Sequence, residues 1–284
     1  MGLVDHITRC NVKDLSKFLP FYIEQFHVGW IYRKNLMHLD IFSDTFNIYP
    51  NFVALNEKLD NFENRSAIFA EICNSLEKKG LIKGWRGENY PVTLGLDHPP
   101  LMQIERAAAS FFGIRAYGIH LNGYVKHTNG LMMWIAKRSL DKQVAPGKLD
   151  NMVAGGQPIG MSLKDNLIKE AREEAALSAH LALLAKPVGL ISYLTEYNYG
   201  LRHDFLFTYD LELPKDFVPK NNDGEVEEFY LWPVDFIKNK LEETFDFKFN
   251  TALVLIDFFI RHGLLDPDEE KNYDTLIRGL RTSF

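Results

Sequence analysis

Three glutamates that lie close together in the chain are the residues best suited to a chemical role. Glu170, Glu173 and Glu174 fall in a segment whose apolar residues recur at four-residue steps, and this spacing predicts an amphipathic helix. Positions three or four apart share a helix face, so the carboxylates gather in one place instead of ringing the helix. The apolar stripe on the opposite face, suited to packing on a sheet, consists of Leu163, Leu167, Ala171 and Ala175.

Crowded carboxylates repel one another unless a cation neutralises them. Hard divalent cations prefer oxygen ligands, so Mg²⁺ is the expected cofactor, with Mn²⁺ as an alternative, shared with substrate phosphates. The Gly155-Gly156 pair predicts a turn directly before the helix, and Ser162 with Asp165 forms a capping-box pattern at its start. The competing interpretation is a solvated acidic helix face with no ligand.

The order of these acids resembles the Nudix box, which reads G-x5-E-x7-R-E-U-x-E-E-x-G-U with U aliphatic. Aligned from Gly155, the chain supplies Glu170, Glu173 and Glu174 at the three later acidic positions. The sequence therefore resembles that of a Nudix hydrolase. The departures from the box are Met161 in place of its first Glu, Lys169 in place of its Arg and Ala176 in place of its last Gly.

These departures differ in their expected consequences. Lys169 keeps the positive charge of the Arg but lacks its planar fork of donors. Ala176 has poorer access to the left-handed backbone region than Gly, so the helix is expected to end differently. Met161 removes a carboxylate, and a non-catalytic diphosphate-binding protein therefore stays open as an alternative to a hydrolase.

The resemblance also implies roles for individual residues. Glu170, Glu173 and Glu174 are expected to be catalytic and to hold the metal, with the Gly155 carbonyl as a further metal ligand. In Nudix enzymes a Glu on a later loop often accepts the proton of the attacking water. Glu225 is the favoured candidate for this base, with Glu227 and Glu228 as alternatives in the same segment.

The diphosphate and a flat organic group both require binding residues. Lys137 and Arg138 end an apolar segment expected to lie beside the glycine pair. Exposed basic residues often only solvate a surface, so a purely structural role is the alternative for each. Aromatic rings supply stacking partners for a heteroaromatic substrate. The full set of expected substrate-binding residues is Lys137, Arg138, Lys169, Arg202, Trp30 and Tyr117.

A second resemblance extends over almost the whole chain. Segments 148–158 and 165–170 look like those of the Nudix subfamily related to thiamine diphosphate metabolism, which includes the Nudix part of some fungal thiamine pyrophosphokinases and free-standing plant and yeast enzymes. A long amino-terminal region shared by those proteins is matched as well. The further matching pieces are segments 18–21, 28–31, 84–92, 117–124 and 250–263.

This resemblance implies hydrolysis of thiamine diphosphate, or of its oxidised or damaged analogues, to a monophosphate and phosphate. A Nudix hydrolase of another nucleoside diphosphate derivative is the main alternative. The chain has no room for a kinase domain after the Nudix portion, so thiamine pyrophosphokinase activity is not expected.

Composition narrows the class of protein further. A net charge of −6 argues against a protein that coats nucleic acid, and no apolar segment is long enough to suggest a membrane span. The two cysteines, Cys10 and Cys73, are too few for a disulfide framework, which fits a cytoplasmic protein. The expected partner is a small-molecule diphosphate, and a homodimer is one open arrangement.

The pattern along the chain predicts two domains of mixed α+β structure. Residues 1–112 are expected to form a smaller α+β accessory domain, and residues 113–284 a Nudix domain with a mixed sheet in an α/β/α sandwich. Within them we expect a helix over 65–79, a second helix near 101–109, and a turn at Gly118–Gly123 between two short strands.

Overall fold

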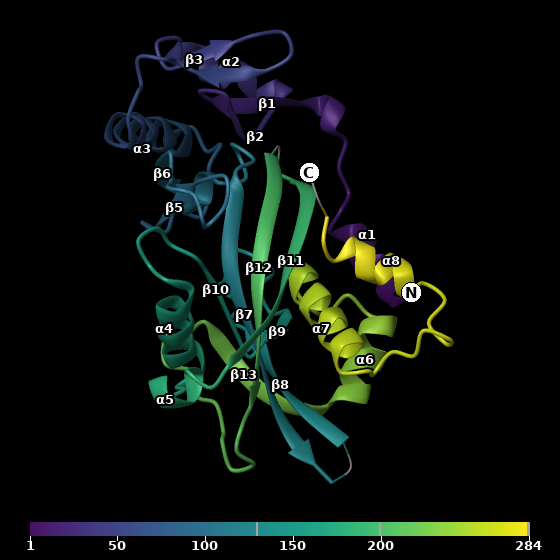
Figure 1. Cartoon of the computed structure of the whole chain (residues 1–284). Helices are drawn as coiled ribbons and strands as arrows, with labels where there is room; N and C mark the ends of the chain where they lie inside the picture. The colour runs from purple at the N-terminus through teal and green to yellow at the C-terminus, as the bar shows by residue number, and fades with distance from the viewer. Residues whose placement is uncertain (129, 199, 283–284) are drawn as a thin grey trace.

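The computed structural model describes residues 1–128, 130–198 and 200–282. It contains an amino-terminal module at one end of a long twisted sheet, and helices cover both faces of that sheet (Figure 1). The mixed α+β architecture and the α/β/α layering expected from the sequence are both confirmed. Among the residues that the structure describes, no helix combines the length and hydropathy needed to cross a bilayer.

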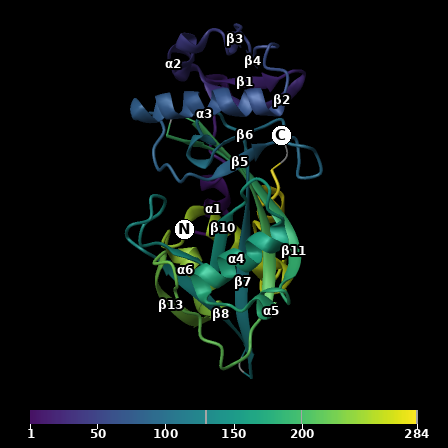
Figure 2. The same ribbon diagram turned by 90° about the vertical axis from the view of Figure 1, so that its left-hand side faces the viewer.

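The amino-terminal module packs one long helix between two small sheets (Figure 2). Its four-stranded sheet has the order β2-β1-β4-β3, and β5 pairs with β6 in a separate antiparallel hairpin. The module comprises η1 (Leu15–Lys17), β1 (Phe18–Ile23), β2 (Phe26–Tyr32), η2 (Arg33–Asn35), α2 (Leu36–Leu39), η3 (Asp40–Phe42), β3 (Phe46–Ile48), β4 (Val53–Leu55), α3 (Phe62–Lys78), β5 (Asn89–Val92), β6 (Met102–Glu105) and η4 (Arg106–Ala108).

The large sheet has the order β11-β12-β7-β8-β13, with β10 added beside β7 and β9 beside β8. β12 and β7 are parallel, and the other strand pairs are antiparallel. The strands are β7 (Arg115–His127), β8 (Gly130–Arg138), β9 (Leu149–Asn151), β10 (Val153–Gly156), β11 (Lys186–Tyr197), β12 (Gly200–Glu212) and β13 (Val226–Pro233).

Two helical layers enclose this sheet. One layer, α4 and α5, packs its apolar side chains on β7 and β10. The other layer is built around α7, which is almost wholly buried, and together with α6 and α8 it covers the opposite face. The helices are α4 (Leu163–Ala175), α5 (Ala179–Ala182), α6 (Val234–Glu243), α7 (Phe249–Arg261) and α8 (Tyr273–Gly279).

The first helix, α1 (Leu3–Arg9), belongs by its packing to the large sheet's domain. Its buried residues Leu3 and Ile7 lie in the same apolar core as α7 and α8. The first ten residues therefore do not belong to the amino-terminal domain, as the expected boundary at residue 112 would require. The apolar face of α1 packs on α7 and α8, near the other end of the chain, and the order of elements along the sequence does not reveal this contact.

Two expected elements are corrected by the structure. No α-helix forms near 101–109, where the only helical turn is the short η4. Met102 and Ile104 are buried and Gln103 between them is not, and this period of two suits the strand β6. No turn forms at Gly118–Gly123, because both glycines lie inside the continuous strand β7. The missing side chain of Gly118 instead permits close approach of Gly155, whose carbonyl oxygen would lie 2.9 Å from an added Cβ.

The helix carrying the glutamates forms as expected. Ser162 caps it by accepting a hydrogen bond from the Asp165 backbone N–H at 3.0 Å, and the apolar stripe faces the sheet. The turn before it differs from expectation, because Gly155 and Gly156 are extended residues of β10 and the left-handed turn lies at Gly160.

The carboxyl end of α4 also differs from expectation. Ala176 adopts the left-handed conformation, with φ 52° and ψ 29°, although it has a Cβ. Hydrogen bonds from the Ala176 and Leu177 N–H groups to the Ala171 carbonyl close the helix, and Leu177 is fully buried. Burial of the next residue therefore holds the backbone in a conformation that alanine does not favour.

Candidate functional site

A cavity of about 800 Å³ lies where the amino-terminal module meets the large sheet's domain. From the second domain it is lined by parts of α4, β7, β10 and β12, by residues 142–144 after β8, and by the start of α7. From the amino-terminal module it is lined by residues 80–84, 86, 88 and 90 and by residues 106–111, apart from 108. The cavity is therefore shared by both parts of the chain.

Glu170 lies directly over the backbone of Gly155. A Cβ added to Gly155 would meet the Glu170 carboxyl group, with its Oε2 only 2.7 Å away. The Lys169 Nζ lies 2.9 Å from the Glu170 Oε1, and both residues line the cavity. Gly155 is thus required because the carboxylate occupies the space that a side chain would take.

Glu173 also lines the cavity, one turn further along α4. Its carboxylate lies 2.9 Å from the Lys169 Nζ, so one ammonium bridges Glu170 and Glu173. Burial opposes the charge of Lys169, but the two carboxylates outweigh it and raise the pKa of the ammonium above its ordinary value. Lys169 thus neutralises the acidic face of α4 instead of standing apart as a separate substrate contact.

Glu174 occupies a different position from its two neighbours. It is 6% exposed, does not line the cavity, and accepts a hydrogen bond from the Ala154 backbone N–H at 2.8 Å. Burial, with further contributions from the negative charges of Glu170 and Asp150, raises the pKa of Glu174 to about 8. Glu174 therefore holds β10 against α4 and is mostly uncharged near neutral pH, directly behind the cavity wall.

The donor set fits a hard cation, because the carboxylate oxygens of Glu170 and Glu173 dominate it. Among the described residues, however, no three His, Cys, Asp or Glu side chains converge closely enough to hold a metal ion by themselves. A metal at this wall would therefore need oxygen atoms from phosphate and water to complete its shell. Met161 does not line the cavity; its carbonyl accepts a hydrogen bond from Gln157 at 2.6 Å.

The three candidate bases point in different directions. Glu225 lines the cavity and forms an ion pair with Lys142, which lines it too. Glu227 and Glu228 lie outside the cavity, where Glu227 pairs with Lys137 at 3.1 Å and Glu228 accepts a hydrogen bond from a tyrosine. Of the three, only Glu225 is placed near the acidic face of α4.

The structure separates the six residues expected to bind substrate. Tyr117 and Arg202 line the cavity, with the Tyr117 ring tilted against Phe205 and the Arg202 guanidinium over the Tyr197 ring at 3.7 Å. Arg138 lines it as well, but is 8% exposed and pairs with Asp150 at 2.8 Å. It secures the buried wall of the cavity.

Lys137 and Trp30 lie away from the cavity, which corrects their expected place in the site. Lys137 follows the alternation of β8 to the side opposite Arg138, where Glu227 neutralises it. Trp30 packs beside Leu194 and Leu201, and its ring meets His27 edge to face. The large Trp30 side chain therefore packs β2 against the large sheet's domain.

A chain of buried amides fixes the orientation of His120, which the sequence did not single out. Asp210, paired with Arg261, only accepts hydrogen bonds, so Asn122 presents its Nδ2 to it at 2.9 Å. The Asn122 Oδ1 then accepts from Asn151 at 2.7 Å, and the Asn151 Oδ1 accepts from the His120 Nδ1 at 2.8 Å. The His120 Nε2 is therefore an acceptor on a cavity-lining residue.

The charge state of His120 follows from its surroundings. Burial, aided by the positive charge of Lys248, lowers the pKa of His120 to about 4. The ring is therefore neutral near neutral pH, and its Nε2 can accept a hydrogen bond from a substrate N–H, an O–H group or water. No sequence motif marks this residue; only the polarity of the buried network reveals it.

The amino-terminal module contributes polar residues that sequence reasoning missed. Arg86, Glu88, Tyr90 and Arg106 all line the cavity. Three of them lie in segment 84–92, one of the segments that match the amino-terminal region of the thiamine-related subfamily. The density of charged and aromatic residues in that segment was the available signal.

The chain is similar to several known proteins and structures. A family model described as a domain of unknown function, DUF4743, matches residues 2–116. Two Arabidopsis thaliana proteins, named as the chloroplastic Nudix hydrolases 24 and 20, are 46% and 44% identical to this chain, with 99% of this chain and 78% of each relative aligned. A solved structure from Deinococcus radiodurans matches 59% of this chain and 97% of its own, with 20% identity and a TM-score of 0.45.

Proposed function

The chain belongs to the Nudix hydrolase family, and from this premise we propose that it hydrolyses thiamine diphosphate, or oxidised analogues of it, to a monophosphate and phosphate. We further propose Mg²⁺ as its cofactor, with Mn²⁺ as an alternative. The observation that carries the proposal is the cavity in which Glu170 and Glu173 face basic and aromatic residues from both parts of the chain.

The acidic face of α4 supports the metal part of the proposal. Glu170 and Glu173 would hold the ion from the cavity side, and the bound cation would favour the ionised form of Glu174 behind them. When bound, the metal supplies charge neutralisation at the diphosphate and lowers the pKa of a coordinated water. Lys169 pairs with both cavity-lining carboxylates, so metal binding would require its ammonium to move away from them, and the substrate phosphates would then attract it.

The remaining residues bind, orient and move a proton. Glu225 is the proposed base, and it accepts the proton of the attacking water once its ion pair with Lys142 separates. Lys142 is then free to approach a phosphate oxygen. Tyr117 offers its ring and hydroxyl to the cavity, and the neutral His120, on the other face of β7, offers a hydrogen-bond acceptor.

The size of the cavity supports a substrate larger than a simple diphosphate. Small-molecule sites usually enclose roughly 300–1,000 Å³. At about 800 Å³ this cavity accommodates a diphosphate together with ring systems. The preference for thiamine rests on the resemblance of almost the whole chain to the thiamine-related subfamily. The matching amino-terminal segments carry this resemblance beyond the Nudix box.

The test is a panel of phosphate-release assays with the purified full chain. Thiamine diphosphate, an oxidised thiamine diphosphate, ADP, ADP-ribose and a nucleotide sugar are compared with Mg²⁺, with Mn²⁺ and with a chelator; a phosphatase releases phosphate from the products of the last two. We expect the highest kcat/KM for a thiamine-type diphosphate and no turnover with the chelator. A higher kcat/KM for a nucleotide derivative would contradict the substrate, and metal-independent turnover would contradict the cofactor.

A further inference from the structure

The amino-terminal module supplies one whole side of the cavity. Lys83, Arg86, Glu88, Tyr90 and Arg106 line it from segments between α3 and η4. Three of these five side chains carry a positive charge, whereas the α4 side presents Glu170 and Glu173. We call these five residues the amino-terminal wall.

This wall is docked firmly onto the strand that leads to α4. A Cβ added to Gly156 would meet the Tyr90 hydroxyl, with the Tyr90 Cζ at 2.9 Å and the Arg106 Cζ at 3.1 Å. The Asn89 carbonyl accepts a hydrogen bond from the Ile159 N–H at 2.9 Å, and Tyr90 is 5% exposed. The position of Arg106 relative to Glu170 is therefore set by packed, buried contacts.

The two arginines of the wall are held in different ways. Arg106 pairs with Glu88 at 2.9 Å and lies over the Tyr90 ring, yet 42% of its side chain stays accessible. At Arg86 the backbone N–H is anchored to the buried carboxylate of Glu105 at 2.9 Å. Within the described part of the chain, no acidic side chain lies within ion-pair distance of the Arg86 guanidinium, so its donors are available to a ligand.

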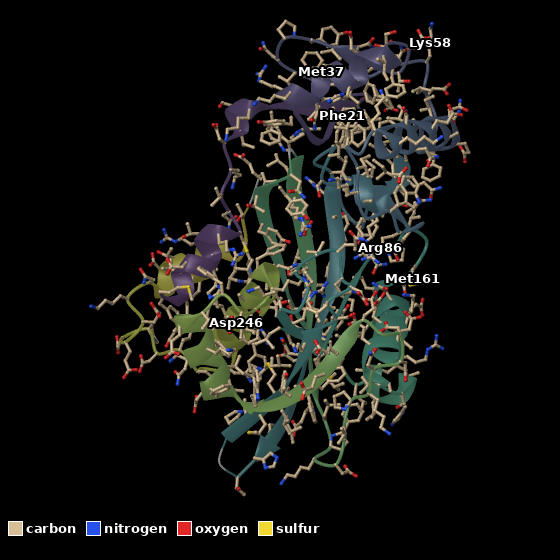
Figure 3. All side chains as sticks on the ribbon, turned by 180° about the vertical axis from the view of Figure 1, so that it is seen from behind. Phe21, Met37, Lys58, Arg86, Met161 and Asp246 are labelled. Atoms are coloured by element: carbon tan, nitrogen blue, oxygen red, sulfur yellow. The ribbon has the colours of Figure 1, made fainter. Side chains whose placement is uncertain are left out.

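Positive charge accumulates on this side of the cavity. Burial is the main reason that the pKa of Lys142 falls to about 8, and the positive charges of Arg138 and Arg86 lower it further. Cations that repel one another across a cavity are stabilised when an anion lies between them. Figure 3 shows Arg86 on the side of the module that faces the Met161 region, whereas Lys58 lies at the module's far end.

We propose that the amino-terminal wall is half of the substrate site, in which Arg86 and Arg106 bind the diphosphate oxygens across the cavity from Glu170 and Glu173. This inference rests on the proposed function and assigns a role to a module that otherwise has none. Guanidinium groups suit the task because their planar donors match two phosphate oxygens at once. Tyr90 acts as a positioning residue, because its ring lies beneath the Arg106 guanidinium and supports it.

The test compares Arg86→Gln and Arg106→Gln with Lys58→Gln, a matched loss of charge in the same module. Steady-state kinetics with thiamine diphosphate and Mg²⁺ are expected to give a KM raised ~10-fold or more in both arginine variants, with kcat changed much less. Arg86→Lys is expected to recover part of the loss, and Lys58→Gln to match the wild type. Unchanged KM in Arg86→Gln, or an equal rise in Lys58→Gln, would overturn the proposal.

Calorimetric titration with inorganic diphosphate separates this inference from the proposed function. Binding by the wild type that weakens ~10-fold or more in Arg86→Gln supports the amino-terminal wall, even if thiamine diphosphate is not hydrolysed. Binding that is absent in the wild type, or equal in wild type and variant, counts against it. Thermal unfolding of Arg86→Gln should match that of the wild type, because this exposed side chain has no partner within ion-pair distance.

Discussion

The two sides of the cavity reach it by different structural routes. The acidic side comes from one helix, where Glu170 and Glu173 are placed by the helical period alone. The amino-terminal wall comes from a loop, a hairpin and a 3₁₀ turn, so Arg86 and Arg106 meet only through tertiary packing. A local motif therefore reveals one half of the site, and the fold supplies the other.

Neighbouring glycines connect these two sides. Gly155 leaves room for the Glu170 carboxylate, and Gly156 leaves room for Tyr90 and Arg106. Consecutive residues of a strand face opposite ways, so β10 receives Glu170 on one of its faces and Tyr90 with Arg106 on the other. The Gly-Gly pair, which suggested a turn in the sequence, instead allows two domains to approach a single strand.

The largest effect is expected on the free energy of unfolding, when the buried negative charge of Asp150 is removed. Asp150 is 3% exposed and pairs with Arg138 at 2.8 Å and Lys248 at 3.2 Å. Asp150→Asn leaves both cations without their carboxylate, and the free energy of unfolding should fall by about 3–5 kcal/mol. Urea unfolding at neutral pH measures this loss, and a loss below ~1 kcal/mol would contradict the assigned role.

The stability lost in Asp150→Asn should depend on pH. Burial opposes the charge of Asp150, but Lys248 and Arg138 outweigh it and hold the pKa of the carboxyl well below its usual range. A depressed pKa contributes stability that is present above the unfolded value, about 3.9, and is lost as the pH falls through the folded value. The gap in unfolding free energy between wild type and Asp150→Asn should therefore narrow below about pH 4, and a constant gap would contradict this explanation.

The next effect tests the acidic side itself. Glu173→Gln or Glu174→Gln should lower kcat by roughly 10²-fold or more, because Glu173 is expected to hold the metal and the bound metal favours the ionised form of Glu174 behind it. Glu174→Gln should also weaken the α4–β10 contact at Ala154, whereas the half-exposed Glu173 should leave stability unchanged. Glu243→Gln on the exposed part of α6 is the control, and full activity in both α4 variants would make the ligand assignment untenable.

The smallest effect concerns the end of α4. Ala176 holds a left-handed conformation that glycine adopts without steric cost, so Ala176→Gly should raise the free energy of unfolding by about 0.5–1 kcal/mol. Denaturant unfolding of the two proteins side by side measures it. A loss of stability would mean that the backbone at this position is not strained.

Sequence reasoning predicted those parts of the molecule that depend on local periodicity. The stripe at Leu167, Ala171 and Ala175, the cap at Ser162 and the α/β/α layers follow from spacing and from the resemblance to the Nudix box. The family assignment to Nudix hydrolases is confirmed by relatives at 44–46% identity over 99% of the chain.

Other features depended on contacts between distant residues and were missed. The helix α1 packs on α7 and α8 from the other end of the chain, and Trp30 serves packing instead of the site. The burial of Glu174 behind Glu170 reflects the close approach of β10, which helix spacing does not encode. His120 owes its orientation to a network of side chains from three strands.

The most direct test of the two-sided cavity compares Gly155→Ala with Gly156→Ala in steady-state kinetics with Mg²⁺ and thiamine diphosphate. The added methyl at residue 155 displaces the flexible Glu170 carboxylate, so we predict a kcat lowered by ~10-fold or more. At residue 156 it displaces Tyr90 and Arg106, so we predict chiefly a raised KM. The same kinetic change in both variants, or wild-type kinetics in both, would contradict a site built from two opposed sides.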